Sequence, residues 1–192
     1  MSNYDIDNWS LAERINSKQY QCGHCSEKVA SGTGYYHRDY SNVLIYICPH
    51  CGKPTFFLAN KQIPKPLPGR SIKNLPQDIN DVYGEMRESY SAGAYTGVVL
   101  LGRKLIMHLA AVNGANQNQS FESYVNYLGD GGYVPPPANK SLGYIRKIGN
   151  QKNHELILGT ENEAQKVTKF VESLLYFLYE LKDDLEIKED EE

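Results

Sequence analysis

The pattern of apolar and polar positions changes character once along the chain, close to Pro76. Before this proline, short clusters of aromatic and β-branched residues alternate with turn residues, which is typical of β-strands. After it, apolar residues recur every three or four positions, which is typical of amphipathic helices. The sequence therefore predicts a small β-rich segment followed by a mainly helical domain.

Five helices are expected after Pro76, joined by short connections. The first begins where the proline-rich segment ends. The second extends from Ala92 to about Asn113 and is the most apolar, so we expect it at the centre of the domain. Two short helices follow, and the fifth begins at a capping box formed by Thr160 and Glu163. Five helices with short connections predict an α-helical bundle.

The β-rich segment contains four cysteines in two close pairs. They read Cys22-Gly-His-Cys25 and Cys48-Pro-His-Cys51, and the segment between the pairs is predicted to form a hairpin. Two residues between cysteines allow a tight turn to direct both thiolates at one metal ion, and two such turns complete a tetrahedron. Cys22, Cys25, Cys48 and Cys51 are therefore predicted to hold a structural zinc ion in a zinc ribbon.

Two alternatives compete with a zinc site. Disulfide bonds are disfavoured because all the cysteines lie in the two pairs and nothing marks the chain as exported. A thioredoxin-like redox motif is disfavoured because the pattern lacks a βαβ unit. His24 and His50 lie inside the pairs and are alternative ligands, but sulfur at both ends of each pair favours the cysteines. A bound zinc ion would contribute on the order of 10 kcal/mol to the folding of so small a segment.

These patterns divide the chain into four parts. Residues 1–60 form the zinc ribbon with its N-terminal lead-in, and residues 61–76 form a proline-rich basic linker. Residues 77–182 form the helical bundle, and residues 183–192 form an acidic tail. The predicted fold class is mainly α, a five-helix bundle preceded by a small β zinc ribbon. No apolar run approaches the ~20 residues of a membrane span, and no signal sequence is visible, so a cytoplasmic protein without membrane contact is expected.

The net charge of −3 is distributed unevenly. Residues 180–192 contain eight acidic and two basic side chains, so this segment carries −6 and the rest of the chain +3. Lys65 and Arg70 in the basic linker are candidates for contacts with nucleic-acid phosphates. The further candidates for such contacts lie in the bundle: Arg103, Lys147 and Lys152. A solvated linker kept soluble by its lysines is the alternative interpretation.

Two places in the predicted bundle carry candidate chemistry. Arg103 lies in an apolar stripe of the second helix, where a buried guanidinium needs a partner. A structural ion pair or a snorkelling side chain is the alternative. Arg146, Asn150 and His154 recur every four residues and would form one polar ridge on a helix. Guanidinium, amide and imidazole groups can together bind a phosphate and transfer a proton without a metal. A capping and solvating helix face is the alternative.

The order of these segments resembles a bacterial family, the domain of unknown function numbered 4145. The resemblance is carried by the strings IPKPLPG, AYTGVVLLGRKL, IRKIGNQKNH and LLYFLYEL, and it extends from about Cys22 to Leu181. That family is similar to the HEPN superfamily of helical, usually dimeric domains. Members of the superfamily are frequent in bacterial defence and toxin systems, and many are metal-independent ribonucleases. The resemblance implies a HEPN-like bundle and a homodimer.

The resemblance also implies roles for the polar ridge. His154 would act as general acid or base, Arg146 would hold the scissile phosphate, and Asn150 would orient either group. The superfamily motif commonly places an arginine directly before the polar residue, a position that Gly149 occupies here. Two functional hypotheses follow. The first is an RNA-associated protein of the defence or toxin type with metal-independent endoribonuclease activity. The second is a non-catalytic dimeric adaptor that binds nucleic acid or a protein partner.

Overall fold

A computed structural model describes residues 11–151 and 158–181 of the chain, and in residues 149–151 it describes only the backbone. The chain divides into two compact units, with the boundary between Leu67 and Pro68. We call residues 11–67 the sheet unit, and residues 68–151 and 158–181 the helical unit. Each unit has a hydrophobic core of its own, so each is described by itself.

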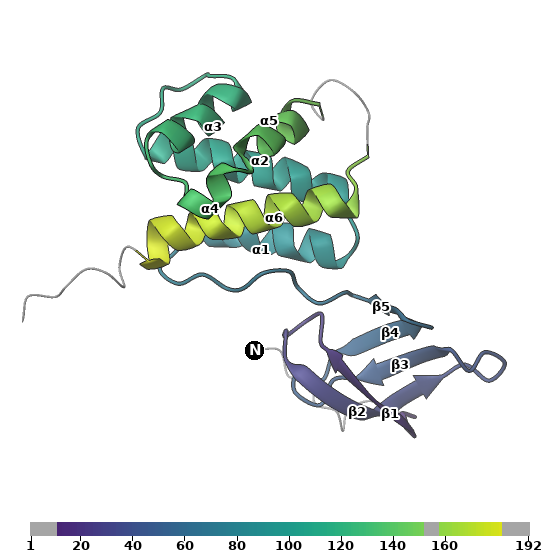
Figure 1. Ribbon diagram of the computed structural model, residues 1–192. Helices are drawn as coiled ribbons and strands as arrows, with labels where there is room; N and C mark the ends of the chain where they lie inside the picture. The colour runs from purple at the N-terminus through teal and green to yellow at the C-terminus, as the bar shows by residue number, and fades with distance from the viewer. Residues whose placement is uncertain (1–10, 152–157, 182–192) are drawn as a thin grey trace, which may run out of the picture. The chain divides into compact units, whose positions relative to one another are not determined.

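The sheet unit is a meander of five antiparallel strands in sequence order (Figure 1). The strands are β1 (Glu13–Gln21), β2 (Lys28–Tyr36), β3 (Val43–Ile47), β4 (Pro54–Leu58) and β5 (Lys61–Ile63). An irregularity between Arg14 and Lys18 shifts the register between β1 and β2. Each strand pairs with the strand that follows it, so all of the connections are local.

The core of the sheet unit is small and aromatic. Phe57 packs edge-on against Tyr20 and Tyr46, with ring centroids 5.2 and 5.5 Å away. The buried sulfur atoms of Cys22 and Cys48 complete this cluster. So few apolar side chains cannot offset the chain entropy lost by a unit of this size, so the fold needs an additional constraint.

The sequence-based prediction of a small zinc ribbon and a five-helix bundle is wrong on both counts. The first part of the chain is a full five-stranded antiparallel sheet, and the described residues form six helices. Strand β1 was missed because its sequence, ERINSKQYQ, is mostly polar and lacks the alternation that marks a strand. Strand β5 was missed because it has three residues and ends directly before Pro64, where only an edge strand is tolerated.

The helical unit contains six α-helices (Figure 1). They are α1 (Gln77–Ser91), α2 (Tyr95–Val112), α3 (Phe121–Asp130), α4 (Pro136–Asn139), α5 (Leu142–Gln151) and α6 (Glu161–Leu175). A π-helical segment, η2 (Tyr176–Glu180), continues α6. Helix α4 was missed because it is a single turn inside a run of prolines. A proline at the first helical positions loses no hydrogen bond, so such a turn remains helical.

Helix α2 is the central element, as predicted, and it contacts α1, α3, α5 and α6. Its buried residues include Val98, Leu105 and Leu109, which lie in the core of the unit. With 18 residues, α2 has the length and mean composition of a membrane span, which the short apolar runs of the sequence did not predict. A buried core helix of a soluble protein satisfies the same criteria, and α2 contacts four other helices.

The segment before α1 packs on the helical unit through a buried carboxylate. The Glu180 side chain is 7% exposed and accepts a hydrogen bond of 2.9 Å from the backbone N–H of Lys73. The Arg70 guanidinium lies 3.2 Å from the other carboxylate oxygen. The Tyr83 hydroxyl donates to the carbonyl of Arg70 over 3.1 Å, and Ile72 is buried in the core. The predicted linker of residues 61–76 is thus divided between strand β5 and this docked segment.

Candidate metal centre

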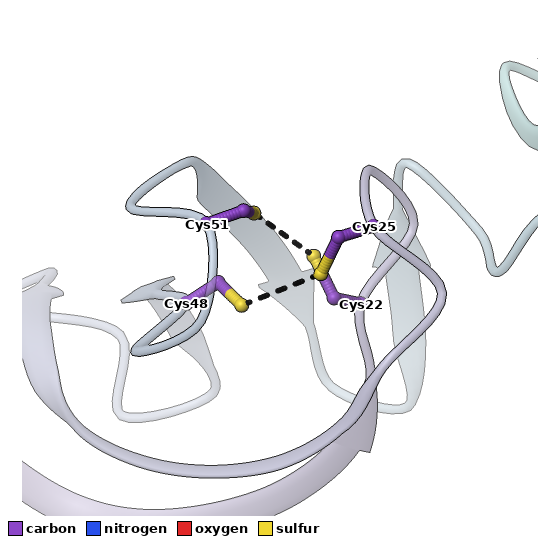
Figure 2. Close-up of side chains that lie close together, drawn as sticks. All are labelled: Cys22, Cys25, Cys48 and Cys51. Carbon is purple, nitrogen blue, oxygen red and sulfur yellow. Dashed lines mark hydrogen bonds between the residues drawn. The ribbon is translucent and has the colours of Figure 1, made fainter. Parts of the chain in front are cut away.

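Four cysteine sulfur atoms converge at one end of the sheet unit (Figure 2). Cys22 and Cys25 come from the turn after β1, and Cys48 and Cys51 come from the turn after β3. The Sγ atoms of Cys22 and Cys51 are 3.8 Å apart, and those of Cys25 and Cys48 are also 3.8 Å apart. All four lie within 4.8 Å of one another, an arrangement that could hold a metal ion.

The two cysteine turns have the same backbone geometry. In the first, the N–H of Ser26 donates to the carbonyl of Cys22 over 2.9 Å, and in the second, the N–H of Gly52 donates to that of Cys48 over 2.8 Å. Ser26 and Gly52 both have left-handed backbones, with φ of 63° and 68°. Glycine adopts this conformation without strain, whereas serine does not. Gly52 is a residue type that favours this turn, whereas Ser26 carries no sequence signal for a left-handed residue.

Gly23 is required in the first turn for a different reason. A Cβ atom at this position would lie 2.5 Å from the carbonyl oxygens of Pro64 and Lys65. Real Cβ atoms do not approach backbone oxygens so closely, so any side chain would push the Cys22 turn away from the segment after β5. Gly23 therefore provides space and not conformational freedom.

The sulfur geometry fits a tetrahedral metal site. A zinc–sulfur bond of about 2.3 Å requires neighbouring sulfur atoms of a tetrahedron to be about 3.8 Å apart. The separations of Cys22 from Cys51 and of Cys25 from Cys48 have that value. A disulfide would need a sulfur–sulfur distance of about 2.05 Å, and all four cysteines are free. The Cys₄ set of ligands predicted from the spacing is therefore brought together by the fold.

Burial makes two of the cysteine thiols, those of Cys25 and Cys51, harder to ionise. It raises the pKa of the Cys25 and Cys51 thiols above their ordinary value, and the charge of Cys22 raises both further. Burial also raises the pKa of Cys22, but hydrogen bonds from the backbone of His24 and Cys25 and from the thiols of Cys25 and Cys48 together outweigh it, so the net shift is downward. A divalent cation would compensate the thiolate charges, so metal binding and proton release are coupled at this site.

His24 and His50, the histidines inside the cysteine pairs, do not belong to the described sulfur cluster. The backbone N–H of His24 donates to the sulfur of Cys22 over 3.4 Å. The Nε2 atom of the same residue lies 3.0 Å from the carbonyl oxygen of Pro54, so this ring is held away from the sulfur atoms. The side chain of His50 is exposed. Within the described residues, the four cysteines are the only members of the cluster.

The predicted basic candidates are placed as follows. The guanidinium carbon of Arg103 lies 4.4 Å from the ring centroid of Phe121, on α3. Burial lowers the pKa of the Arg103 guanidinium, which nevertheless stays protonated at neutral pH. Lys65 is partly buried and Lys147 is exposed. Arg70 lies over the Tyr176 ring at 4.3 Å and pairs with Glu180, so its guanidinium already has partners in the helical unit.

The predicted polar ridge can be described only at its first residue. The Nη1 atom of Arg146 donates a hydrogen bond of 2.7 Å to the side-chain oxygen of Asn126, on α3. The side chain of Asn150 lies outside the described residues, and so do Lys152 and His154. The convergence of Arg146, Asn150 and His154 therefore stays a prediction. The partner Asn126 was missed because nothing in the local sequence links α3 to α5.

One face of the sheet presents apolar side chains that pair across four strands. Tyr35 of β2 pairs with Ile45, Ile45 pairs with Phe56, and Phe56 pairs with Ile63 of β5. Directly paired residues point to the same face of a sheet. We call Tyr35, Ile45, Phe56 and Ile63 the cross-strand row. Its first three members are partly exposed and Ile63 is 43% exposed, whereas the opposite face carries the buried Phe57. The row was missed because it depends on the strand register.

The comparison with protein families concerns the helical part of the chain. The model of a domain of unknown function, DUF4145, matches residues 84–190, which is more than half of the sequence. The chain belongs to the DUF4145 family. The DUF4145 match confirms the resemblance at the family level and begins within α1, so the sheet unit lies outside it. No curated protein and no solved structure matches the chain. The likeness of DUF4145 to the HEPN superfamily stays a prediction.

Proposed function

We propose that this protein binds single-stranded RNA through its sheet unit, which a zinc ion holds in shape. The observation that carries the proposal is the cross-strand row. Its two aromatic rings, Tyr35 and Phe56, share one partly exposed sheet face and are separated by a single strand. Nucleobases stack on aromatic side chains displayed in this way, because every base has a π face.

The charge of the sheet unit supports an anionic ligand. Residues 11–67 contain seven basic and three acidic side chains. One of the basic residues, Lys61, extends the face that carries the row, because it pairs with Leu58 and Leu58 pairs with Val43. Leu58 is 44% exposed and Lys61 is exposed. An aromatic face bordered by an ammonium group suits an RNA strand, whose phosphates contact the lysine while its bases stack.

Zinc is the metal that best suits the Cys₄ cluster. Four thiolates at tetrahedral spacing favour zinc or iron over harder ions. All four positions come from protein, so the ion would have a structural role. We expect about one equivalent of zinc per chain in protein purified without chelators, measured by elemental analysis. Protein that is folded but carries no zinc would contradict this assignment.

The test of RNA binding compares two faces of the same strand. Fluorescence anisotropy with a short labelled polyuridine RNA at low salt measures the affinity of each variant. Exchange of both Tyr35 and Phe56 for Leu keeps an apolar surface but removes the π faces, and we expect the affinity to fall roughly tenfold or more. The matched control is Tyr36→Leu, on the opposite face and 52% exposed, which should bind as the wild type does.

Three results would overturn the proposal. The first is a wild-type protein that does not bind RNA at low salt. The second is equal affinity of the wild type and the double variant, with zinc content and circular dichroism unchanged in both. The third is a double variant that keeps its RNA affinity but changes its oligomeric state, which would make the cross-strand row a protein interface.

Cleavage of RNA is the second candidate, and one observation favours it. Arg103 and Arg146 come from different helices and both contact α3, through Phe121 and Asn126 respectively. Two guanidinium groups near one helix provide positive charge for a phosphate. Incubation of mixed RNA in magnesium-free buffer tests the activity. Equal, background cleavage by the wild type and His154→Ala would exclude an enzyme of this type.

The wider setting of the protein rests on the sequence resemblance. A homodimer and a role in bacterial defence or toxin systems are what the HEPN superfamily suggests for DUF4145, and a cytoplasmic location accords with free thiols at a zinc site. Light scattering of the purified full chain tests the dimer. A mass corresponding to one chain at all concentrations would remove that part of the proposal.

A further inference from the structure

A hollow of about 510 Å³ lies in the helical unit between α6 and the junction of α4 and α5. Its floor is apolar and includes Ala138, Ile145 and Phe170. Hollows of this size are typical of sites for small organic ligands, which usually combine an apolar surface with a few polar groups. This hollow is separate from the cysteine cluster and from the cross-strand row, both of which belong to the sheet unit.

Three lysines line the hollow from two sides. Lys166 and Lys169 are three residues apart on α6 and therefore share one helix face. Lys140 lies across from them, directly after α4. The side chains of all three are exposed, so their ammonium groups are available to a ligand from solvent. Among the described lining residues there is no carboxylate.

An aromatic ring and hydroxyl groups complete the lining. Tyr144 on α5 faces Lys166, whose Nζ atom lies 4.1 Å from the ring centroid. This cation–π contact holds one ammonium group at the wall of the hollow. Ser141 and Ser173 also line it, and the hydroxyl of Ser173 donates to the carbonyl of Phe170 over 2.8 Å. The lining therefore combines three cations with an aromatic and apolar surface.

The described lining residues carry three ammonium groups and no carboxylate, so the potential in the hollow favours an anion. A bound phosphate would supply the negative charge. A ligand with a phosphate alone would leave the apolar floor and Tyr144 unused. A ligand that carries phosphates and a flat ring would use both parts of the hollow.

We propose that this hollow binds a nucleoside phosphate, with the phosphates near Lys140, Lys166 and Lys169 and the base against the apolar floor. The inference does not rest on the proposed RNA-binding role of the sheet unit. The same chemistry comes from two sources, a free nucleotide or a nucleotide within an RNA strand, and the experiment separates them.

The experiment uses calorimetric titration of the full chain at low salt with three probes: ATP, inorganic triphosphate and polyuridine RNA. The test variant carries Lys140→Gln, Lys166→Gln and Lys169→Gln. The matched control removes the same charge elsewhere through Lys28→Gln, Lys73→Gln and Lys104→Gln, all at exposed positions. A further variant, Tyr144→Leu, tests the aromatic wall. Circular dichroism of each variant confirms that the helices are retained.

We expect the test variant to bind ATP about tenfold or more weakly than the wild type, because three cation contacts are lost. The control should bind ATP as the wild type does. Weaker binding of triphosphate than of ATP, with the difference reduced in Tyr144→Leu, would support contact with the base. If the test variant also loses affinity for RNA, the ligand of the hollow is a nucleotide within an RNA strand. If it loses affinity for ATP but binds RNA as the wild type does, the ligand is a free nucleotide.

Two outcomes would overturn the inference. One is a wild-type protein that binds neither ATP nor triphosphate and whose RNA affinity is the same in the test variant. The other is an equal loss of affinity in the test and control variants, which would show that net charge alone acts. Neither outcome depends on the variants of Tyr35 and Phe56, so the two proposals fail separately.

Discussion

At the scale of single residues, Gly23 provides the sharpest test of the metal centre. A methyl group in Gly23→Ala would meet two backbone oxygens at 2.5 Å, and backbone cannot rotate away as a side chain can. We expect the variant to be destabilised by roughly 1–3 kcal/mol and to lose its metal to a chromogenic chelator faster than the wild type. The control is Gly32→Ala in β2, where the added atom would lie at an ordinary 3.5 Å from the nearest neighbour. Equal metal retention in the two variants would contradict the predicted clash.

Tyr83 links the stability of the helical unit to alkaline pH. Burial, and then the negative charge of Glu172, raises the pKa of this phenol from its ordinary 10 to about 12. Between these two values the folded protein keeps a proton that the unfolded chain has lost, so stability falls as the pH rises. One such group changes the unfolding free energy by about 1.4 kcal/mol per pH unit in this window. We therefore expect urea unfolding at pH 9, 10 and 11 to show a weaker pH dependence in Tyr83→Phe than in the wild type.

Two further expectations check the comparison of the wild type with Tyr83→Phe. Burial also raises the pKa of Tyr179, so part of the alkaline dependence should remain in the variant. At pH 8, below both values for Tyr83, the variant should lose only the hydrogen bond to the carbonyl of Arg70. An identical pH slope in the two proteins would show that Tyr83 ionises as freely when folded as when unfolded.

The residues of the metal centre could be predicted from the sequence, whereas the partners of the charged residues could not. The spacing within each cysteine pair is typical of a local turn, so the sequence alone predicts that the sulfur atoms of Cys22 and Cys25 lie on the same side of that turn. Arg146 and Asn126 are twenty residues apart on different helices, and their hydrogen bond depends on how α3 and α5 pack. The same holds for Arg70 and Glu180, which only the tertiary structure brings together.

At the scale of elements, the capping box of α6 is the clearest case of a local sequence that determines a boundary. The Thr160 hydroxyl oxygen accepts from the N–H of Glu163 over 3.3 Å, and the Glu163 carboxylate accepts from the N–H of Thr160 over 2.8 Å. Thr160→Ala should lower the unfolding free energy of the helical unit by about 1 kcal/mol. Thr160→Ser keeps the hydroxyl and should restore most of this loss. Urea denaturation followed at the helical ellipticity measures both, and equal loss in the two variants would contradict the capping role.

Elements without such local signals were the ones that sequence reasoning missed. Strand β1 has a mostly polar sequence, and it is a strand because β2 provides its hydrogen-bond partners. Helix α4 is one turn long, which is too short for a helical repeat of apolar residues to be recognised in the sequence. Helix α2, by contrast, carries its apolar pattern over 18 residues, and both its presence and its central position could be predicted.

At the scale of the whole molecule, the two units should respond differently to metal removal. The sheet unit has a small core that depends on the Cys₄ cluster, whereas the helical unit has a large core of its own. We expect a chelator to remove the thermal transition of the sheet unit and to leave that of the helical unit within a few degrees of its original midpoint. Differential scanning calorimetry with and without chelator measures both transitions.

Restoration by added zinc completes this test. Zinc should return the first transition, and magnesium should not, because thiolates favour softer ions. A single transition that shifts as a whole on chelation would show that the units unfold together and would contradict their independence. The boundary between the two compact units lies between Leu67 and Pro68, ahead of the change of pattern near Pro76.

The matching backbone of the two cysteine turns bears on how the metal centre is assembled in time. Each turn alone offers two sulfur ligands, so we expect the pair made first during synthesis to bind an ion only weakly. The second pair emerges only after β2 and β3, the strands between the two turns, have been made. We therefore expect tight binding of the ion only once β2 and β3 have paired, because their pairing brings the two turns together.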